Sequence, residues 1–292
     1  MSLSPTVRDV LRAATAQLDR AGVDAPRTTA RVLLAHVLGV SKEWLIAHDD
    51  HVLSPETQAR FTALMQRVLD HEPLAYVIGH RPFYDLDLYV DARVLVPRPE
   101  TEQLVDLALT ALREVPSVPF ACADIGTGSG AIAIAIAKHA LCVRVLATDI
   151  SRDALRVARQ NAERYAVAAR VVFVQADLLG AVWMLPPVIV ANLPYVARAE
   201  IEVLPPEIRT HEPRVALDGG EDGLALVRRL LAQIAERVRA GRAEQWRAAF
   251  LEIGATQGEA ALSAARTLLP EARATLHRDL AGRDRVLVLQ RE

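Results

Sequence analysis

The stretch ADIGTGSGAIAIAIA at residues 123–137 joins the end of an apolar run to an Ala/Ile-rich segment through three glycines. Gly126, Gly128 and Gly130 permit a tight turn and allow the backbone to approach a ligand closely. The helix predicted to begin near Gly130 presents free N–H groups and the positive end of its dipole at the same place. The stretch therefore predicts a strand, a ligand-binding turn and a helix in succession.

From residue 97 onward, predicted strands and helices alternate. Continuous apolar strands such as PVIVA at 187–191 suit a parallel sheet that is covered on both faces. The connection DLAGRD at 279–284 is too short for a helical crossover, so the last two strands must pair antiparallel. By analogy, this outline indicates the α/β, seven-stranded, Rossmann-like methyltransferase fold. Strands are expected at 118–124, 143–148, 171–175, 187–191, 248–253, 273–278 and 285–290, and helices at 100–113, 130–140, 151–165, 222–240 and 256–268.

The N-terminal part of the chain carries a different pattern. Apolar residues recur at helical spacing, and Gly22 and Gly39 end two such runs, while Ser54 followed by proline marks another helix start. In FYDLDLYVD at 83–91, apolar and polar residues alternate with a period of two, which predicts a β-hairpin. The predicted organisation is a small helical-bundle domain at 1–75, a β-hairpin linker at 76–96 and a catalytic domain at 97–292.

Bulk composition limits the classes of partner. The 292 residues are 51% hydrophobic and carry a net charge of −2, which indicates a globular protein without a strong field for nucleic acid. Because no 18-residue apolar run and no signal peptide are visible, we expect a cytoplasmic protein without a membrane partner. Cys122 and Cys142 lie in apolar segments and are expected to be buried, so no metal is predicted.

Acidic residues beside the glycine loop discriminate between cofactors. The loop also fits the dinucleotide pattern G-x-G-x-x-G/A. However, Asp124 precedes the loop, where it would repel a pyrophosphate and attract the ammonium group of S-adenosylmethionine. Asp149 closes the next strand, where it can accept both ribose hydroxyls, and Asp177 follows the third strand, where it can accept an adenine amino group. Aspartates at strand ends also commonly cap turns, which is the structural alternative.

The motif ANLPY at 191–195 follows the apolar strand and changes character abruptly. Asparagine and proline are usual in strand-to-loop turns, so a purely structural role is the alternative. Ligands of open α/β sheets bind outside the carboxyl ends of the strands, so Asn192 should face a methyl donor. Such a site suits a planar nitrogen of an amide or an exocyclic amine.

Each residue of this motif has a predicted role toward that nitrogen. The side-chain oxygen of Asn192 accepts one N–H, and the backbone carbonyl of Leu193 accepts the other. Pro194 stiffens the turn so that both acceptors are preorganised. The ring of Tyr195 stacks on the flat substrate group.

Nearly the whole chain resembles the release factor glutamine methyltransferases, the HemK-type enzymes. That family methylates the side-chain amide of the glutamine in the Gly-Gly-Gln loop of peptide-chain release factors. The resemblance is carried by segments in the family's order: EPLAYVIGHRPFY (72–84), VPRPETEQLVD (96–106), DIGTGSG (124–130), HEPRVALDGGEDGL (211–224), LEIG (251–254) and DLAGRDRV (279–286).

The resemblance implies S-adenosylmethionine as cofactor, S-adenosylhomocysteine as product and a release factor as protein substrate. It implies that Asn192 to Tyr195 hold the substrate glutamine, with Asn192 also near the cofactor. The residues that it implies for cofactor binding are Gly126, Thr127, Gly128, Ser129, Gly130, Asp149, Asp177, Leu178 and Asn192.

One departure from the family pattern supports a different methyltransferase function. The family usually has Asn-Pro-Pro-Tyr, whereas Leu193 stands here in place of the first proline. Asn-Leu-Pro-Tyr is also typical of ribosomal RNA adenine dimethyltransferases, so an N6-adenine methyltransferase acting on RNA or DNA is the alternative. That rival predicts a basic surface and an accessory domain after the catalytic one, whereas this chain is slightly acidic and carries its extra helical domain in front of the catalytic one. A nicotinamide dehydrogenase is a second rival, for which no convincing acid/base residue stands out.

Overall fold

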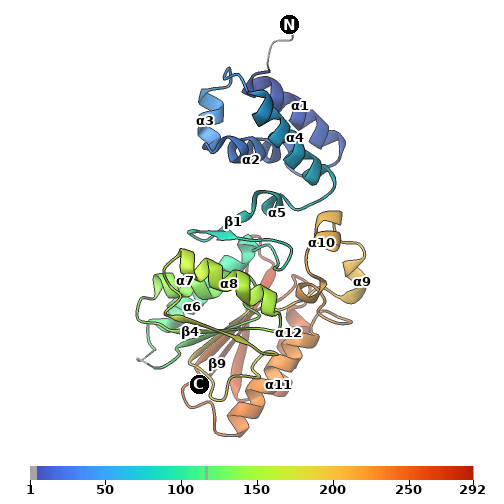
Figure 1. Cartoon of the computed structure of the whole chain (residues 1–292). Coiled ribbons are helices and arrows are strands. Elements are labelled where there is room, and N and C mark those ends of the chain that lie inside the picture. The colour runs from blue at the N-terminus through green and yellow to red at the C-terminus, as the bar shows by residue number, and fades with distance from the viewer. Residues whose placement is uncertain (1–4, 116–117, 292) are drawn as a thin grey trace. The chain divides into compact units, whose positions relative to one another are not determined.

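The computed structural model describes residues 5–115 and 118–291, which form two compact units. The first unit comprises Met1–Gly79 with the short segment Pro206–His211, and the second comprises His80–Pro205 with Glu212–Glu292. Figure 1 shows a helical part and a part built around a twisted sheet. The α/β class predicted from the sequence, with a helical region before the sheet, is confirmed.

The first unit is a small helical bundle whose helices begin at side-chain caps. Thr6 accepts a hydrogen bond from Asp9 N, Ser41 from Trp44 N and Ser54 from Thr57 N. Each cap satisfies a backbone donor that the first turn leaves free. Aliphatic side chains with Phe61 and Met65 form the unit's own core. The helices are α1 (Val7–Arg20), α2 (Pro26–Leu38), α3 (Lys42–Ala47), α4 (Pro55–Leu69), α5 (Leu74–Ile78) and α10 (Pro206–His211).

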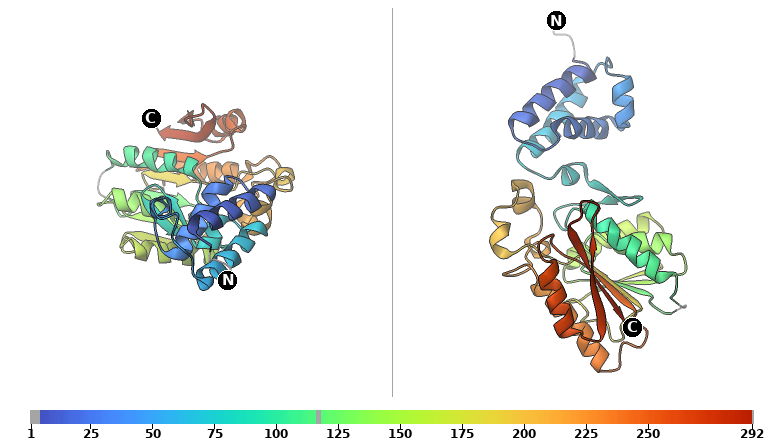
Figure 2. Two further views of the ribbon diagram at one scale, coloured as in Figure 1. Left: turned by 90° about the horizontal axis from the view of Figure 1, so that it is seen from above. Right: turned by 180° about the vertical axis from the view of Figure 1, so that it is seen from behind.

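The second unit contains a hairpin and a seven-stranded sheet. The sheet has the order β5-β4-β3-β6-β7-β9-β8, in which β9 pairs antiparallel with β7 and β8 and the other neighbouring strands pair parallel. The antiparallel pair predicted from the short DLAGRD connection is therefore confirmed, and Figure 2 shows it in red in the view from behind. The strands are β1 (His80–Phe83), β2 (Leu86–Tyr89), β3 (Cys122–Ile125), β4 (Val145–Asp149), β5 (Val171–Gln175), β6 (Val188–Ala191), β7 (Ala248–Glu252), β8 (Ala272–Arg278) and β9 (Asp284–Arg291).

Helices cover both faces of this sheet. Because side chains alternate along a strand, Cys122 of β3 enters one apolar core and Ile125 enters the other. The first core lies under α6, α7 and α8, and the second lies under α11 and α12. The helices are η1 (Pro99–Thr101), α6 (Glu102–Leu112), α7 (Ala131–His139), α8 (Arg152–Arg164), α9 (Arg198–Ile201), η2 (Arg214–Ala216), α11 (Ala225–Arg239) and α12 (Gly258–Leu268).

The buried side chain of Asn161 connects the hairpin to the glycine loop. Its Nδ2 donates to the carbonyls of Tyr89 and Ser129, at 3.0 and 2.9 Å, and its Oδ1 accepts from Tyr89 N at 2.8 Å. A buried amide satisfies three backbone groups in this way. The loop that follows β3 is thereby attached to α8 and to the hairpin.

Some expectations differ from the structure. Cys122 is buried, but Cys142 is exposed because it lies in the turn between α7 and β4, so its predicted burial is wrong. The strand expected from residue 118 begins at Cys122. The short helices α5, α9 and α10 were not predicted, since helices of four to six residues depend on tertiary packing more than on sequence pattern.

Two properties of the described residues concern membranes and metals. None of the helices in 5–115 and 118–291 has the length and apolar character that crossing a membrane requires. Within the same ranges, no three His, Cys, Asp or Glu side chains gather as a metal site would need.

Candidate active site

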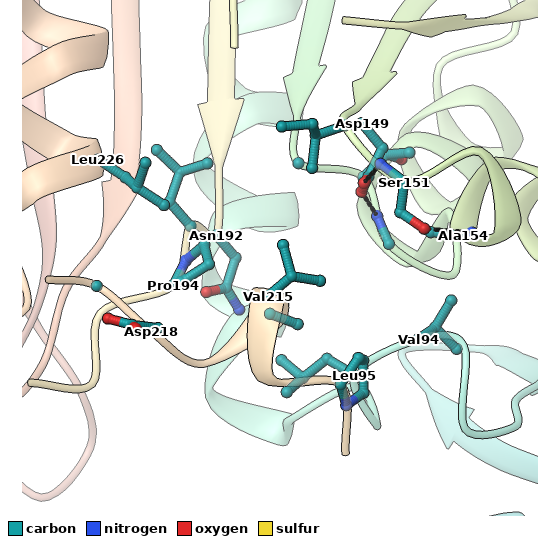
Figure 3. Close-up of a pocket in the computed structure, with 18 of the residues that line it drawn as sticks. Val94, Leu95, Asp149, Ser151, Ala154, Asn192, Pro194, Val215, Asp218 and Leu226 are labelled. Atoms are coloured by element: carbon teal, nitrogen blue, oxygen red, sulfur yellow. Dashed lines mark hydrogen bonds between the residues drawn. The ribbon is translucent and has the colours of Figure 1, made fainter. Parts of the chain in front are cut away.

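A cavity of about 660 Å³ opens at the carboxyl ends of β3, β4 and β6. This is where ligands of parallel sheets bind, because the loops that leave the strands diverge there. Figure 3 shows Asp149 and Ser151 on one side of the cavity and Asn192 and Pro194 on the other. The sequence-predicted residues that line it are Gly126, Thr127, Gly128, Ser129, Asp149, Asp177, Leu178, Asn192, Leu193 and Pro194.

The glycine loop lies against the cavity with backbone angles that favour glycine. Gly126, Gly128 and Gly130 have φ values of +77°, +54° and +83°. A Cβ on Gly126 would lie 3.1 Å from Cδ2 of Leu193, so the loop packs directly on the ANLPY segment. Gly130 is the N-cap of α7 and is not among the cavity-lining residues of the described chain.

Asp149 faces the glycine loop from the end of β4. Its Oδ2 accepts from Gly128 N at 2.9 Å, and its Oδ1 accepts from Ser151 N at 2.8 Å. Burial raises the pKa of this carboxyl, and the backbone donors at Ser151 and Gly128 oppose the shift. A carboxylate has about four acceptor positions, so two remain for ligand hydroxyls.

Asp124 lies beneath the loop instead of at the cavity wall. Its Oδ2 accepts from the Thr127 hydroxyl at 2.7 Å and from Ala133 N at 3.1 Å, and the residue is fully buried. Burial raises its pKa to about 7. The structure gives Asp124 a role in holding the loop, and it does not place the carboxylate where the predicted ammonium contact would need it.

Asp177 lies at the cavity rim and is already partnered. Its Oδ2 is 2.5 Å from the Arg229 guanidinium, and both side chains are half exposed. Leu178, next to it, has a φ of +50° and is buried against the second core. An adenine amino group at this place would share the Asp177 carboxylate with Arg229.

Asn192 follows the end of β6 and points an amide into the cavity. Its Nδ2 donates to the hydroxyl of Thr101 at 2.9 Å. Thr101 ends η1 and is buried, so the amide is fixed from behind. This bond fixes the orientation of the amide, and Oδ1 is the atom of the Asn192 side chain that can accept from a ligand.

The three residues after Asn192 divide between wall and interior. Leu193 is buried in the second core and Pro194 lines the cavity. Tyr195 is not among the lining residues of the described chain, and its hydroxyl lies toward Glu252. Burial raises the pKa of Tyr195, and the charge of Glu252 raises it further. The structure does not bring the Tyr195 ring to the cavity with its three predecessors.

The segment after α10 supports this loop from the other side. Val196 makes two backbone hydrogen bonds with this segment. Its N–H donates to Leu217 O, and its carbonyl accepts from Gly219 N. Further along, Arg98 donates to the buried carboxylate of Glu212 at 2.6 Å. This ion pair attaches the cavity wall at 213–216 to the segment before η1.

Comparison with known proteins identifies the family. The family model described as PrmC N-terminal domain matches residues 9–79, and the model described as Ribosomal protein L11 methyltransferase (PrmA) matches residues 101–212. A release factor glutamine methyltransferase of Moorella thermoacetica is 39% identical over 98% of this chain and 99% of its own length. The chain belongs to the release factor glutamine methyltransferase family. A relative of the same name from Deinococcus radiodurans is 37% identical over 98% of each chain.

Solved structures share the fold of this methyltransferase. The catalytic domain of human METTL16 in complex with a MAT2A 3'UTR hairpin has a TM-score of 0.55, with 15% identity over 81% of this chain and 82% of that one. A methyltransferase from Pyrococcus furiosus has a TM-score of 0.50, with 16% identity over 78% of this chain and 98% of that one. At these identities the likeness concerns the fold alone.

Sequence reasoning missed several cavity residues of this release factor glutamine methyltransferase family member. Ile150 lines the cavity beside Asp149 although it is 56% exposed. The signal that the sequence offered for it was a large apolar residue directly after the acid that ends a predicted strand. Leu95, Val215 and Leu226 gave no such signal, because only the fold brings these three segments to one cavity.

Gly223 provides a test of how this methyltransferase shapes its ANLPY segment. Its φ is +75°, and a Cβ there would collide with Tyr195 O and with Nε2 of Gln257. Gln257 normally donates from Nε2 to Tyr195 O at 2.8 Å. We expect Gly223→Ala to displace this carbonyl and to lower kcat at least about tenfold, which corresponds to roughly 1.4 kcal/mol in the barrier.

Gly282→Ala is the matched control for backbone strain. Gly282 has the same φ of +75°, but a Cβ there meets nothing within 4 Å. Thermal unfolding of Gly282→Ala should therefore show the backbone cost alone, about 1 kcal/mol, and Gly223→Ala should lose more because its Cβ also collides with its neighbours. Steady-state kinetics should show a loss for Gly223→Ala only, and equal activity of the two variants would contradict the displacement.

Proposed function

We propose that this chain transfers a methyl group from S-adenosylmethionine to the side-chain amide nitrogen of the glutamine in the Gly-Gly-Gln motif of peptide-chain release factors. The observation that carries the proposal is the Asn192 amide, whose nitrogen is bound to Thr101 and whose oxygen is left for a ligand N–H. Its place across the cavity from Asp149 supports a reaction between two ligands.

The cofactor half of the cavity fits S-adenosylmethionine. The left-handed glycines leave a cradle that side chains would fill, and the two acceptor positions left on Asp149 suit the two ribose hydroxyls. Ile150 offers an apolar surface for the adenine ring, and Asp177 and Leu178 border it. When bound, S-adenosylmethionine supplies a methyl group on a positively charged sulfur and leaves as S-adenosylhomocysteine. No metal ion has a part in this proposal.

The substrate half supplies hydrogen-bond acceptors for an amide. A glutamine amide nitrogen is a poor nucleophile because its lone pair is delocalised, so the chain must hold both of its N–H groups. Oδ1 of Asn192 accepts one N–H, the backbone carbonyl of Leu193 accepts the other, and Pro194 keeps the turn rigid. The amide nitrogen can lose its proton to water after transfer, so no strong base is required.

The parts of the chain take different roles in the proposal. Residues 1–75 dock the release factor, residues 76–96 link the domains, and residues 97–292 carry out catalysis. Because release factors act in translation, the reaction belongs in the cytoplasm. No direct contact with nucleic acid is required.

A labelling experiment tests this function. The protein is incubated with S-adenosylmethionine labelled in the methyl group and with one of four substrates: release factor, release factor whose loop glutamine is replaced, undermethylated ribosomal RNA, or unmethylated DNA. We expect label on the intact release factor alone, at the glutamine amide. Label on either nucleic acid, or equal label on the factor without its loop glutamine, would overturn the proposal.

A further inference from the structure

A buried polar group lies behind the Asn192 amide and is not among the described residues that line the cavity. This group is the carboxyl of Glu252, the last residue of β7, which is 1% exposed. Strand β7 pairs with β6, and Ala191 lies opposite Leu251, so Glu252 and Asn192 leave adjacent strands side by side. Thr101, which accepts from Asn192, also lies beside Glu252.

The surroundings of Glu252 are mostly partners for a negative charge. Burial raises its pKa to about 7, while the Thr101 hydroxyl, the Arg285 guanidinium and the Tyr195 hydroxyl lower it and the charge of Glu100 raises it. Neither carboxylate oxygen makes a hydrogen bond of normal geometry with any described residue. A buried carboxyl without hydrogen-bond partners lowers the stability of the fold, so its presence suggests a role other than stabilisation.

We propose that Thr101 and Glu252 are positioning residues that fix the orientation of the Asn192 amide. This inference rests on the proposed function, because it assumes that Oδ1 of Asn192 receives the substrate N–H. Thr101 has one hydroxyl proton, and an ionised carboxylate can only accept hydrogen bonds. With Glu252 ionised, the Thr101 proton turns to it, and Oγ1 of Thr101 can only accept from Nδ2 of Asn192.

Protonation of Glu252 reverses this chain of hydrogen bonds. A neutral carboxyl can donate to Oγ1 of Thr101, so the Thr101 proton becomes free to turn toward Asn192. The Asn192 amide can then rotate and present N–H groups to a substrate amide that itself offers N–H groups. The orientation that binds substrate therefore requires ionised Glu252. Asp124, the other buried acid whose pKa is about 7, contacts Thr127 and Ala133 and has no part in this chain.

The sign of the pH dependence follows. Below about pH 7 Glu252 is protonated, so kcat should fall about tenfold per pH unit on the acid side and level off above pH 8. Tyr195, whose pKa is raised by burial, stays neutral throughout this range. Affinity for S-adenosylhomocysteine should vary much less, because Glu252 is not among the residues that line the cavity.

Three variants separate this role from a structural one. Kinetics with release factor are measured from pH 5.5 to 8.5, with binding of S-adenosylhomocysteine and circular dichroism as checks of folding. Glu252→Gln should lower kcat about tenfold at pH 8 and abolish the fall of kcat below pH 7, which is the acid limb of the pH profile. Affinity for S-adenosylhomocysteine should change little. Thr101→Val should do the same, because it removes the hydroxyl that transmits the effect. Thr101→Ser, which keeps the hydroxyl, should retain both kcat and the limb.

Glu100→Gln is the matched control, because Glu100 is an exposed carboxylate in the same segment. It should leave kcat within about twofold and retain the acid limb. An acid limb that persists in Glu252→Gln, or in Thr101→Val if the first variant fails to fold, would overturn the positioning role and leave the proposed function intact. A wild-type protein that leaves the release factor unlabelled at every pH would overturn both.

Discussion

Asn192→Ala is expected to lower kcat for release-factor methylation at least about a hundredfold while binding of the cofactor persists. The side-chain oxygen is the acceptor that is fixed in advance by the bond from Nδ2 to Thr101, so it needs no reorganisation during the reaction. Removal of one such preorganised polar contact costs roughly 3–4 kcal/mol, which exceeds a factor of one hundred in rate. Single-turnover kinetics with labelled S-adenosylmethionine measure the loss directly.

The control for this variant is its affinity for S-adenosylhomocysteine, which binds but cannot react. Titration calorimetry with S-adenosylhomocysteine should give a Kd within about threefold of wild type, since the two acceptor positions left on Asp149 are untouched by the change. A variant that turns over within tenfold of wild type would show that Asn192 is a turn residue and not the acceptor for the substrate amide.

Asp149→Ala should have the opposite signature and weaken cofactor binding first. The carboxylate accepts from Gly128 N and Ser151 N, and in the proposed function its two remaining acceptor positions bind the ribose hydroxyls. Hydrogen bonds to a charged group contribute about 1.5–3 kcal/mol each, so we expect a loss of at least about 2 kcal/mol, or roughly thirtyfold in Kd for S-adenosylhomocysteine. Turnover at saturating cofactor should change much less than Kd.

Asp153→Ala provides the comparison for the effect of charge alone. Asp153 lies in the first turn of α8, close to Asp149 in sequence, and its side chain is 56% exposed and paired with Arg156. Its removal should leave the Kd within about twofold. The midpoint temperature of thermal unfolding should fall only for Asp149→Ala, because two backbone N–H groups then lose their acceptor. Equal affinities of the two variants would exclude Asp149 from the cofactor site.

The cavity-forming strand ends could be predicted from sequence for a simple reason. Parallel strands carry their carboxyl ends to one edge of a sheet, so residues that follow consecutive apolar runs must meet there. This argument brought Gly126, Asp149 and Asn192 to one site, and all three line the same cavity. The terminal antiparallel pair was predictable as well, because six connecting residues cannot hold a crossover helix.

The direction of individual side chains could not be predicted in the same way. Tyr195 was expected to face the substrate, but its hydroxyl lies toward Glu252, away from the cavity-lining set. Asp124 was expected to meet the cofactor, but it accepts from Thr127 and Ala133 under the loop. In both places the packing of neighbouring elements selects one rotamer among several that the local sequence allows.

The sequence by itself determined the α/β class, the position of the glycine loop, the strand-end Asp149 and Asn192, and the family. These features depend on periodicity, backbone freedom and order along the chain, which are local properties that a sequence displays directly. Only the tertiary structure decided that Thr101 and Glu252 stand behind Asn192 and that the segment around Gly219 supports Pro194. Those contacts join residues far apart in the chain, and their geometry depends on side-chain packing that no local pattern encodes.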